Sequence, residues 1–254
     1  SPRERLIALL TNSFVPCNGR FPILVTLIAL YFTGPCGSSF FDKAASSLLA
    51  ALCLTGFLLL GVLMTFLASR LLSATLLKGV PSSFVLELPP YRRPQILKVI
   101  LRSLLDRTLS TLRRALCAAV PAGALLWCMA NLTMDSRSLL SIAASFLDPF
   151  ARLMGLDGVI LLSFLLGMPA NEIVIPIMLM TYLEQGSLQE INDPNLLRAI
   201  LSENGWSLGT AVCTCLFTLF HWPCLTTLLS IKRETGSLKW TAAAFLLPTL
   251  FGVL

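Results

Sequence analysis

An apolar run from 159 to 183 is interrupted near its middle, and this interruption limits the possible folds more than any other stretch. Pro169 and Pro176 lie inside the run, and Asn171 and Glu172 lie between these two prolines. Lipid cannot satisfy the backbone hydrogen bonds that such a break frees, so a break at membrane depth must face protein or a wet cavity. An ionisable side chain there is a candidate functional residue. The alternative is that Glu172 is a buried, hydrogen-bonded carboxylate that holds a kink.

The composition supports a membrane location for this run and for the other apolar stretches. The 254 residues are 56% hydrophobic and only 13% charged, whereas soluble domains carry about 25% charged residues. We therefore expect an all-α, polytopic transmembrane helical bundle with broken or re-entrant helices. The net charge of +6 does not indicate a nucleic-acid partner, because the basic residues cluster between apolar runs, as they do in cytoplasmic loops.

The charge pattern divides the chain into three regions. Residues 1–76 hold transmembrane segments with a Pro-Cys break, and residues 115–254 hold a second transmembrane region with the Pro-Ala-Asn-Glu break and further C-terminal helices. Residues 77–114 between them are strongly basic, which favours the cytoplasmic side. From Gln95 onward this linker is either an amphipathic helix at the membrane surface or a solvated loop.

The segments on both sides of the run from 159 to 183 are acid-rich, so both favour the outer face of the membrane. A full crossing would separate them onto opposite faces. We therefore favour a re-entrant hairpin over a kinked crossing, with one arm at 159–166, a tip near 167–172 and a second arm to residue 183. Arms of this length reach only part of the way through a hydrocarbon layer of about 30 Å.

Four stretches resemble one family, the FeoB-type ferrous iron transporters of bacteria. They occur in the family's order and cover nearly the whole chain, and the Leu-Pro-Pro-Tyr-Arg and His-Trp-Pro-Cys sequences within them are the most specific. The stretches are residues 13–22, 76–79 with 84–92, 169–176, and 220–224 with 226–228 and 232–237. The resemblance implies a multi-pass gate region in a bacterial cytoplasmic (inner) membrane that takes part in Fe²⁺ import.

The family also carries an N-terminal GTP-binding domain, but no Gly-x-x-x-x-Gly-Lys-Ser/Thr phosphate loop occurs in this sequence. We therefore expect the C-terminal part of the transporter's membrane domain, which is not itself an enzyme. The resemblance implies that GTP is bound and hydrolysed only on the missing N-terminal half. The expected partners are the lipid bilayer, Fe²⁺ as the transported substrate, that GTP-binding half and a second copy in a homo-oligomer.

Iron(II) accepts thiolate, imidazole, carboxylate and carbonyl ligands, and the breaks in this chain offer all of them. The candidate metal-path residues are Cys17, Asn171, Glu172, His221 and Cys224. The structural breaks around them are expected at Pro16, Pro22, Pro169, Pro176 and Pro223.

Several of these residues have structural alternatives. His221 could pack against neighbouring helices beside Trp222, and Cys224 could be a small buried residue. His221 and Cys224 are three positions apart, which places them on one face only if the helix continues through Pro223. Arg20, near the end of the first break, could cap freed carbonyls or pair with Glu172, and we favour the capping role.

Two other functions compete with a metal permease. A nucleoside-type carrier uses gate regions of the same kind, but it would need polar and aromatic side chains near the breaks to hold base and ribose. A non-transporting membrane scaffold would need no polar residues there. No cofactor is expected. None of the eight cysteines shows CxxC spacing, and those outside the breaks are interpreted as small buried residues.

Overall fold

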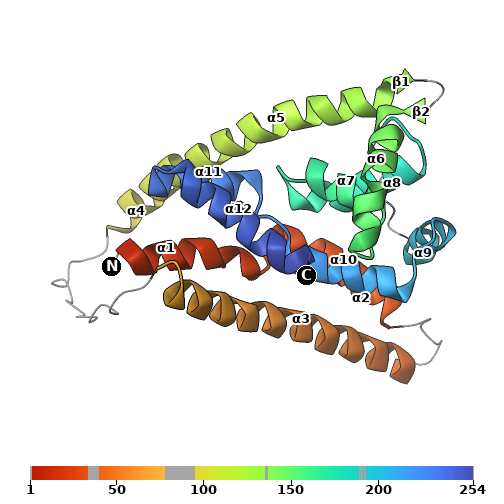
Figure 1. Cartoon of the computed structure of the whole chain (residues 1–254), viewed down its shortest axis with the longest axis horizontal. Helices are drawn as coiled ribbons and strands as arrows, with labels where there is room; N and C mark the ends of the chain where they lie inside the picture. Colours follow the sequence, from red (N-terminus) through yellow and green to blue (C-terminus); the bar gives the residue numbers. More distant parts are fainter. Residues whose placement is uncertain are drawn as a thin grey trace.

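The computed structural model describes residues 2–33, 40–77, 95–134, 137–188, 191 and 193–253. This part of the chain is almost entirely helical (Figure 1). Its only strands are β1 (Thr133–Met134) and β2 (Arg137–Ser138), which pair antiparallel in a short hairpin. The predicted all-α class is therefore confirmed. Residues 84–92, which carry one of the four family-like stretches, and Cys36 lie outside the described residues.

In the first half of the chain, two helices separated by a break are followed by long helices that are largely exposed. In chain order they are α1 (Pro2–Thr11), η1 (Asn12–Phe14), η2 (Asn18–Arg20), α2 (Phe21–Tyr31), α3 (Phe40–Ala74), α4 (Ile96–Arg102), the π-helical η3 (Ser103–Leu109) and α5 (Ser110–Asn131). The last three are continuous, so the described part of the basic linker from Ile96 onward is helical and the solvated-loop alternative is wrong for it.

The second half consists of shorter helices that pack closely. They are α6 (Leu139–Leu153), α7 (Gly158–Leu166), η4 (Asn171–Ile173), α8 (Val174–Tyr182), α9 (Pro194–Glu203), α10 (Leu208–Phe220), α11 (Leu225–Thr235) and α12 (Leu238–Val253). Side-chain oxygens of Asp157, Asp193 and Ser207 cap the N-termini of α7, α9 and α10, which fixes where these helices begin.

Four helical stretches of the described chain are long and apolar enough to cross a membrane: Arg3–Tyr31, Phe41–Ala74, Thr111–Asn131 and Leu208–Thr235. The first and last of these contain breaks. Helices α6 and α7 pass the same test only as a pair, and they are bent by 108° where they join. These findings confirm the predicted polytopic bundle with broken helices.

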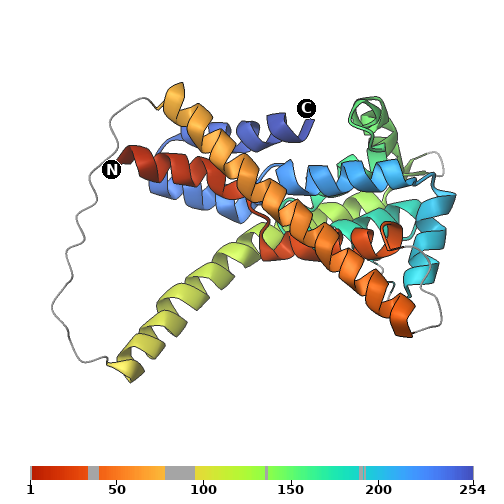
Figure 2. The same cartoon turned by 90° about the horizontal axis from the view of Figure 1, so that it is seen from below.

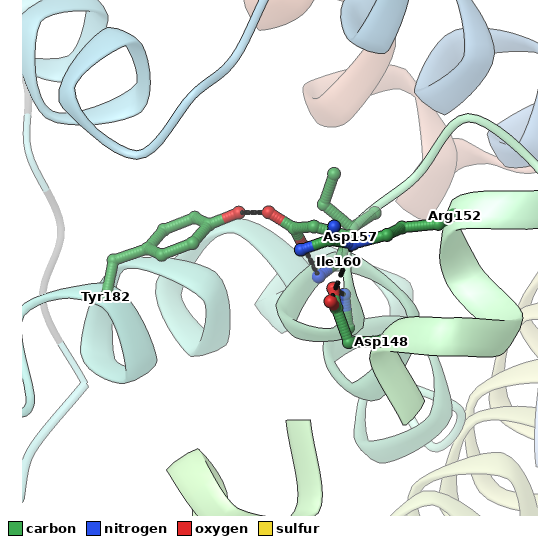
Figure 3. A network of polar contacts seen from close by, with 6 residues as sticks. Asp148, Arg152, Asp157, Ile160 and Tyr182 are labelled. Carbon is green, nitrogen blue, oxygen red and sulfur yellow. Dashed lines mark hydrogen bonds and ion pairs between the residues drawn. The ribbon is translucent and has the colours of Figure 1, made fainter. Parts of the chain in front are cut away.

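Helices α7 and α8 form a hairpin. They pack against each other, and the Tyr182 hydroxyl at the end of α8 donates a hydrogen bond to the Asp157 carboxylate at the start of α7 (Figure 3). Asp157 also accepts from the backbone N–H of Ile160 at 2.6 Å. Because the run returns to its starting point, α7 and α8 have the geometry of the predicted hairpin and not that of a kinked crossing. Re-entry of this hairpin into a membrane from the outer face stays a prediction.

Helix α10 lies in the centre of the bundle, where it contacts α2, α3 and α12. Its buried face packs with Phe14 and Phe164 in the main hydrophobic core. The rings of Phe164 and Phe217 meet edge to face, with their centroids 5.1 Å apart. Helices α3 and α5 lie along opposite sides of this core (Figures 1 and 2). In their most apolar windows only 6% and 12% of the residues are buried, so both helices present apolar surface outward.

Candidate functional site

The first break lies between α1 and α2, at residues 12–20. Val15 and Cys17 have extended backbones, and Cys17 precedes the short turn η2. Pro16 cannot donate a backbone hydrogen bond, which stops α1 from continuing. Pro22 occupies the first turn of α2, where a missing N–H costs little, so this proline starts a helix and does not break one.

The second break forms the tip of the α7–α8 hairpin. Helix α7 ends at Leu166 and is followed by Gly167. Ala170 has an extended backbone, and η4 carries Asn171 and Glu172 into the start of α8. Pro169 lies in this tip as predicted, but Pro176 does not break the chain. It is the third residue of α8, within the first turn, where backbone N–H groups have no partner inside the helix.

The third break separates α10 from α11. The backbones of His221 and Cys224 are extended, and α11 begins directly after Cys224. The helix does not continue through Pro223, so the one-turn spacing that would align His221 with Cys224 does not apply. His221 is fully buried against the rings of Phe164, Phe217 and Trp222.

The first and second breaks meet. Turn η2 packs against η4, and the side-chain amide of Asn171 donates a hydrogen bond to the Cys17 sulfur at 3.8 Å across 154 positions of sequence. A Cβ placed on Gly19 would lie 3.5 Å from Cγ of Glu172. A Cβ at position 19 would therefore make an ordinary van der Waals contact with Glu172, which shows how closely the two turns lie.

One cavity of about 580 Å³ collects residues from all three breaks. Cys17, Asn171, Glu172 and Cys224 line it, which brings together four of the five predicted path residues. Cys17 and Glu172 are exposed, whereas Asn171 is buried. The fifth predicted path residue, His221, is not among the described residues that line this cavity. Its Nδ1 lies 3.0 Å from the carbonyl oxygen of Thr218 and 3.1 Å from that of Phe217.

The lining of this cavity offers several kinds of donor atom to a cation. Two sulfurs, a carboxylate and a carboxamide face the same space. Over the part of the chain that the structure describes, no three His, Cys, Asp or Glu side chains are grouped closely enough to hold a metal ion. A conducting site must bind well enough to replace water and weakly enough to release the ion.

Arg20 connects the first break to the third. It is 2% exposed, and its two terminal nitrogens donate to carbonyl oxygens at the ends of both breaks. These oxygens belong to Ser13 and Leu219, both at 2.9 Å, and to His221 and Trp222, both at 3.1 Å. The predicted capping role of Arg20 is confirmed, and the guanidinium is engaged with carbonyls rather than with Glu172.

The structure adds residues to the site that sequence reasoning missed. The hydroxyl oxygens of Thr226 and Thr227 lie 3.1 and 3.0 Å from the Cys224 sulfur. Asn12 and Glu234 also line the cavity. The sequence signal for the residues on α11 is the helical spacing of its polar side chains. Any amphipathic helix shows the same spacing, so this pattern alone does not indicate a site.

A second cavity, of about 410 Å³, lies at the other end of the hairpin. Asp148, Asp157, Tyr182 and Glu184 are among its lining residues. Asp148 accepts from the backbone N–H of Gly158 at 3.1 Å and pairs with Arg152 at 2.7 Å (Figure 3). The hairpin therefore separates two polar spaces, one at its tip and one at its base.

Comparison with known proteins identifies the family. Residues 112–238, half of the chain, match a family model described as nucleoside recognition (Gate), and residues 54–107 match one described as ferrous iron transport protein B C terminus. The Fe(2+) transporter FeoB of Staphylococcus aureus strain MSSA476 is 27% identical over 257 residues, which cover 97% of this chain and 34% of that protein. The chain belongs to the FeoB family. It corresponds to the C-terminal part of the FeoB membrane region.

Other FeoB proteins match in the same way. Fe(2+) transporter FeoB of Campylobacter jejuni is 26% identical over 258 residues, covering 96% of this chain and 39% of that protein. The Leptospira interrogans FeoB is 26% identical over 271 residues, covering 97% and 37%. The chain thus spans little more than a third of the FeoB relatives that it matches. No solved structure matches it.

Proposed function

We propose that this chain forms the ion-conducting part of a ferrous iron uptake transporter in a bacterial inner membrane. Its relatives are named Fe(2+) transporters, although the chain covers only about a third of their length. The observation that carries the proposal is the convergence of Cys17, Asn171, Glu172 and Cys224 from three breaks on one cavity. Energy input by GTP hydrolysis then belongs to the N-terminal half of such a transporter.

In this proposal the side chains of the cavity act on Fe²⁺ in different ways. The Glu172 carboxylate attracts the cation and offsets the cost of leaving water. The sulfurs of Cys17 and Cys224 are soft donors that favour Fe²⁺ over Mg²⁺ or Ca²⁺, which prefer oxygen ligands. Asn171 holds Cys17 through its amide N–H, which leaves its carbonyl oxygen available as a further ligand. Because the four groups come from separate turns, the site can open when one turn moves.

The proposal is tested by Fe²⁺ uptake in an iron-transport-deficient strain that expresses the full-length transporter containing this chain. We expect Glu172→Gln to reduce uptake several-fold, because it removes the charge and keeps the shape. Cys17→Ser should also reduce uptake, because oxygen is a harder donor than sulfur. The matched controls are Glu203→Gln on the exposed surface of α9 and Cys53→Ser on α3. Normal uptake by both cavity variants at equal expression would refute the proposal.

A nucleoside-type carrier is the second candidate, because the model that matches residues 112–238 is described as nucleoside recognition. The cavity wall argues against it. None of the described residues that line the cavity is aromatic, so a nucleobase would find no ring to stack on. The polar residues of the cavity also disfavour a non-transporting scaffold, because a scaffold would need no polar residues at the breaks. Uptake of a radiolabelled nucleoside that depends on Glu172, with no dependence of Fe²⁺ uptake, would favour the carrier.

A further inference from the structure

The cavity at the breaks extends along one face of α11. Thr226, Ser230 and Glu234 line it at intervals of four residues, and Thr227 and Ile231 lie beside them. Residues spaced by four share one helix face, so the three side chains form a polar row that begins next to Cys224 and continues to the last turn of the helix. Thr111 of α5 and Asn12 of η1 line the same cavity.

The first two side chains of this row present oxygen atoms. The Ser230 hydroxyl donates its proton to the backbone carbonyl of Thr226 at 2.8 Å, so the lone pairs of its oxygen stay available to the cavity. The Thr226 hydroxyl lies against the Cys224 sulfur. Oxygen acceptors of this kind suit a divalent cation that keeps part of its water shell.

The row ends at an ion pair. Glu234 is paired with Arg5 of α1, and their side chains are 49% and 62% exposed, which places the pair at the mouth of the cavity. Helices α1 and α11 both carry basic residues at this end, namely Arg3, Arg5, Lys232 and Arg233. The orientation rule assigns such ends to the cytoplasm. Glu172 at the hairpin tip lines the same cavity.

We infer that the α11 face formed by Thr226, Ser230 and Glu234 is the exit route of a partly hydrated divalent cation toward the cytoplasm, and that the Arg5–Glu234 pair gates its mouth. This inference rests on the proposed function and adds a direction to it. The cation leaves the cysteine and carboxylate ligands, passes the hydroxyl oxygens of α11, and reaches Glu234, which Arg5 must release.

The route is tested by cysteine labelling of the full-length transporter in a background whose native cysteines are replaced. Ser230→Cys is the probe, and Leu229→Cys, on the neighbouring and exposed face of α11, is the matched control. A cationic methanethiosulfonate added from the cytoplasmic side should modify Ser230→Cys about tenfold faster than an anionic one, because a cation-selective path concentrates positive charge. Leu229→Cys faces lipid and should react slowly with both reagents.

The second variant tests the gate. Arg5→Gln should accelerate labelling of Ser230→Cys, whereas Arg152→Gln, which breaks an ion pair at the other end of the molecule, should leave it unchanged. Thr226→Cys serves as a second probe if Ser230→Cys does not fold. Equal reaction at positions 229 and 230, or faster reaction with the anion, overturns the route; no effect of Arg5→Gln overturns the gate. Labelling requires no transport, so these outcomes are independent of the Fe²⁺ uptake test.

Discussion

The guanidinium of Arg20 donates a hydrogen bond of 3.1 Å to the backbone carbonyl of His221, 201 positions later in the chain. It bonds the carbonyls of Ser13, Leu219 and Trp222 in the same way. One buried cation therefore satisfies the carbonyls that two helix breaks set free, and it holds the Cys17 turn against the end of α10. We expect this contact to stabilise the broken helices.

Arg20→Lys should lower the thermal stability of the protein. A lysine ammonium donates from a single point, so it cannot reach all four carbonyls, and each buried polar group left unpaired costs about 1–3 kcal/mol. Thermal unfolding of the purified protein in detergent measures the loss. The control is Arg70→Lys on the exposed surface of α3. Equal midpoints for the two variants would show that the four hydrogen bonds contribute nothing.

Tyr182→Phe should loosen the base of the hairpin. The Tyr182 hydroxyl donates to Asp157 and accepts from the indole N–H of Trp206 at 2.9 Å, so its removal deprives both groups of a partner. We expect faster hydrogen exchange in peptides around residues 157–160 and 204–208. Tyr31→Phe is the matched control, because the buried Tyr31 hydroxyl has no hydrogen-bond partner among the described residues. Unchanged hydrogen exchange in Tyr182→Phe would show that the Tyr182 hydroxyl does not hold the base of the hairpin together.

Gly158→Ala should destabilise the contact between α6 and α7. A Cβ on Gly158 would lie 1.9 Å from the backbone oxygen of Ala144, so the two helices would have to separate. Overpacking of this kind costs roughly 1–3 kcal/mol. At Gly56 of α3 a Cβ would meet nothing within 4 Å, so Gly56→Ala should be neutral or slightly stabilising. Comparison of the two unfolding midpoints checks the prediction, and a harmless Gly158→Ala would show that α6 and α7 separate at no cost.

The predicted orientation can be tested by accessibility labelling of single cysteines in intact cells. Cysteines at positions 98 and 232 should react only from the cytoplasm, because both positions lie in basic segments. Cysteines at positions 135 and 190, which lie outside the described residues, should react from the outer face. Reaction of position 190 from the cytoplasm would contradict re-entry of the hairpin from outside.

The sequence allowed the main features of the site to be predicted because breaks in apolar runs have few solutions. A shared cavity for Cys17 and Glu172 agrees with this constraint, since two breaks that face each other leave no freed backbone group in lipid. The position of His221 was not predictable in the same way. The side chains of His221 and Cys224 could share one helix face only if the helix continued through Pro223. The chain becomes extended there instead.

Other parts of the structure depend on packing that no local pattern encodes. Pro176 was expected to break a helix but falls within the first turn of α8, and its effect depends only on where that helix begins. The 108° bend between α6 and α7 brings Gly158 close to Ala144, a contact between residues 14 positions apart that no local pattern predicts. The polar row on α11 indicates a cavity lining only together with the helices that enclose the cavity beside it, and these come from distant parts of the sequence.

The shortness of the hairpin has an electrical consequence. Its arms are nine residues each, and at 1.5 Å per residue they rise about 14 Å, under half of the roughly 30 Å hydrocarbon layer. We expect water to fill the cavities at its tip and base, and a transmembrane voltage would then fall mainly across this thin layer. A voltage of 100 mV supplies about 2.3 kcal/mol per elementary charge. Fe²⁺ uptake into vesicles under an imposed potassium diffusion potential should therefore rise steeply with negative interior potential, because a doubly charged ion meets nearly the whole field within one short step.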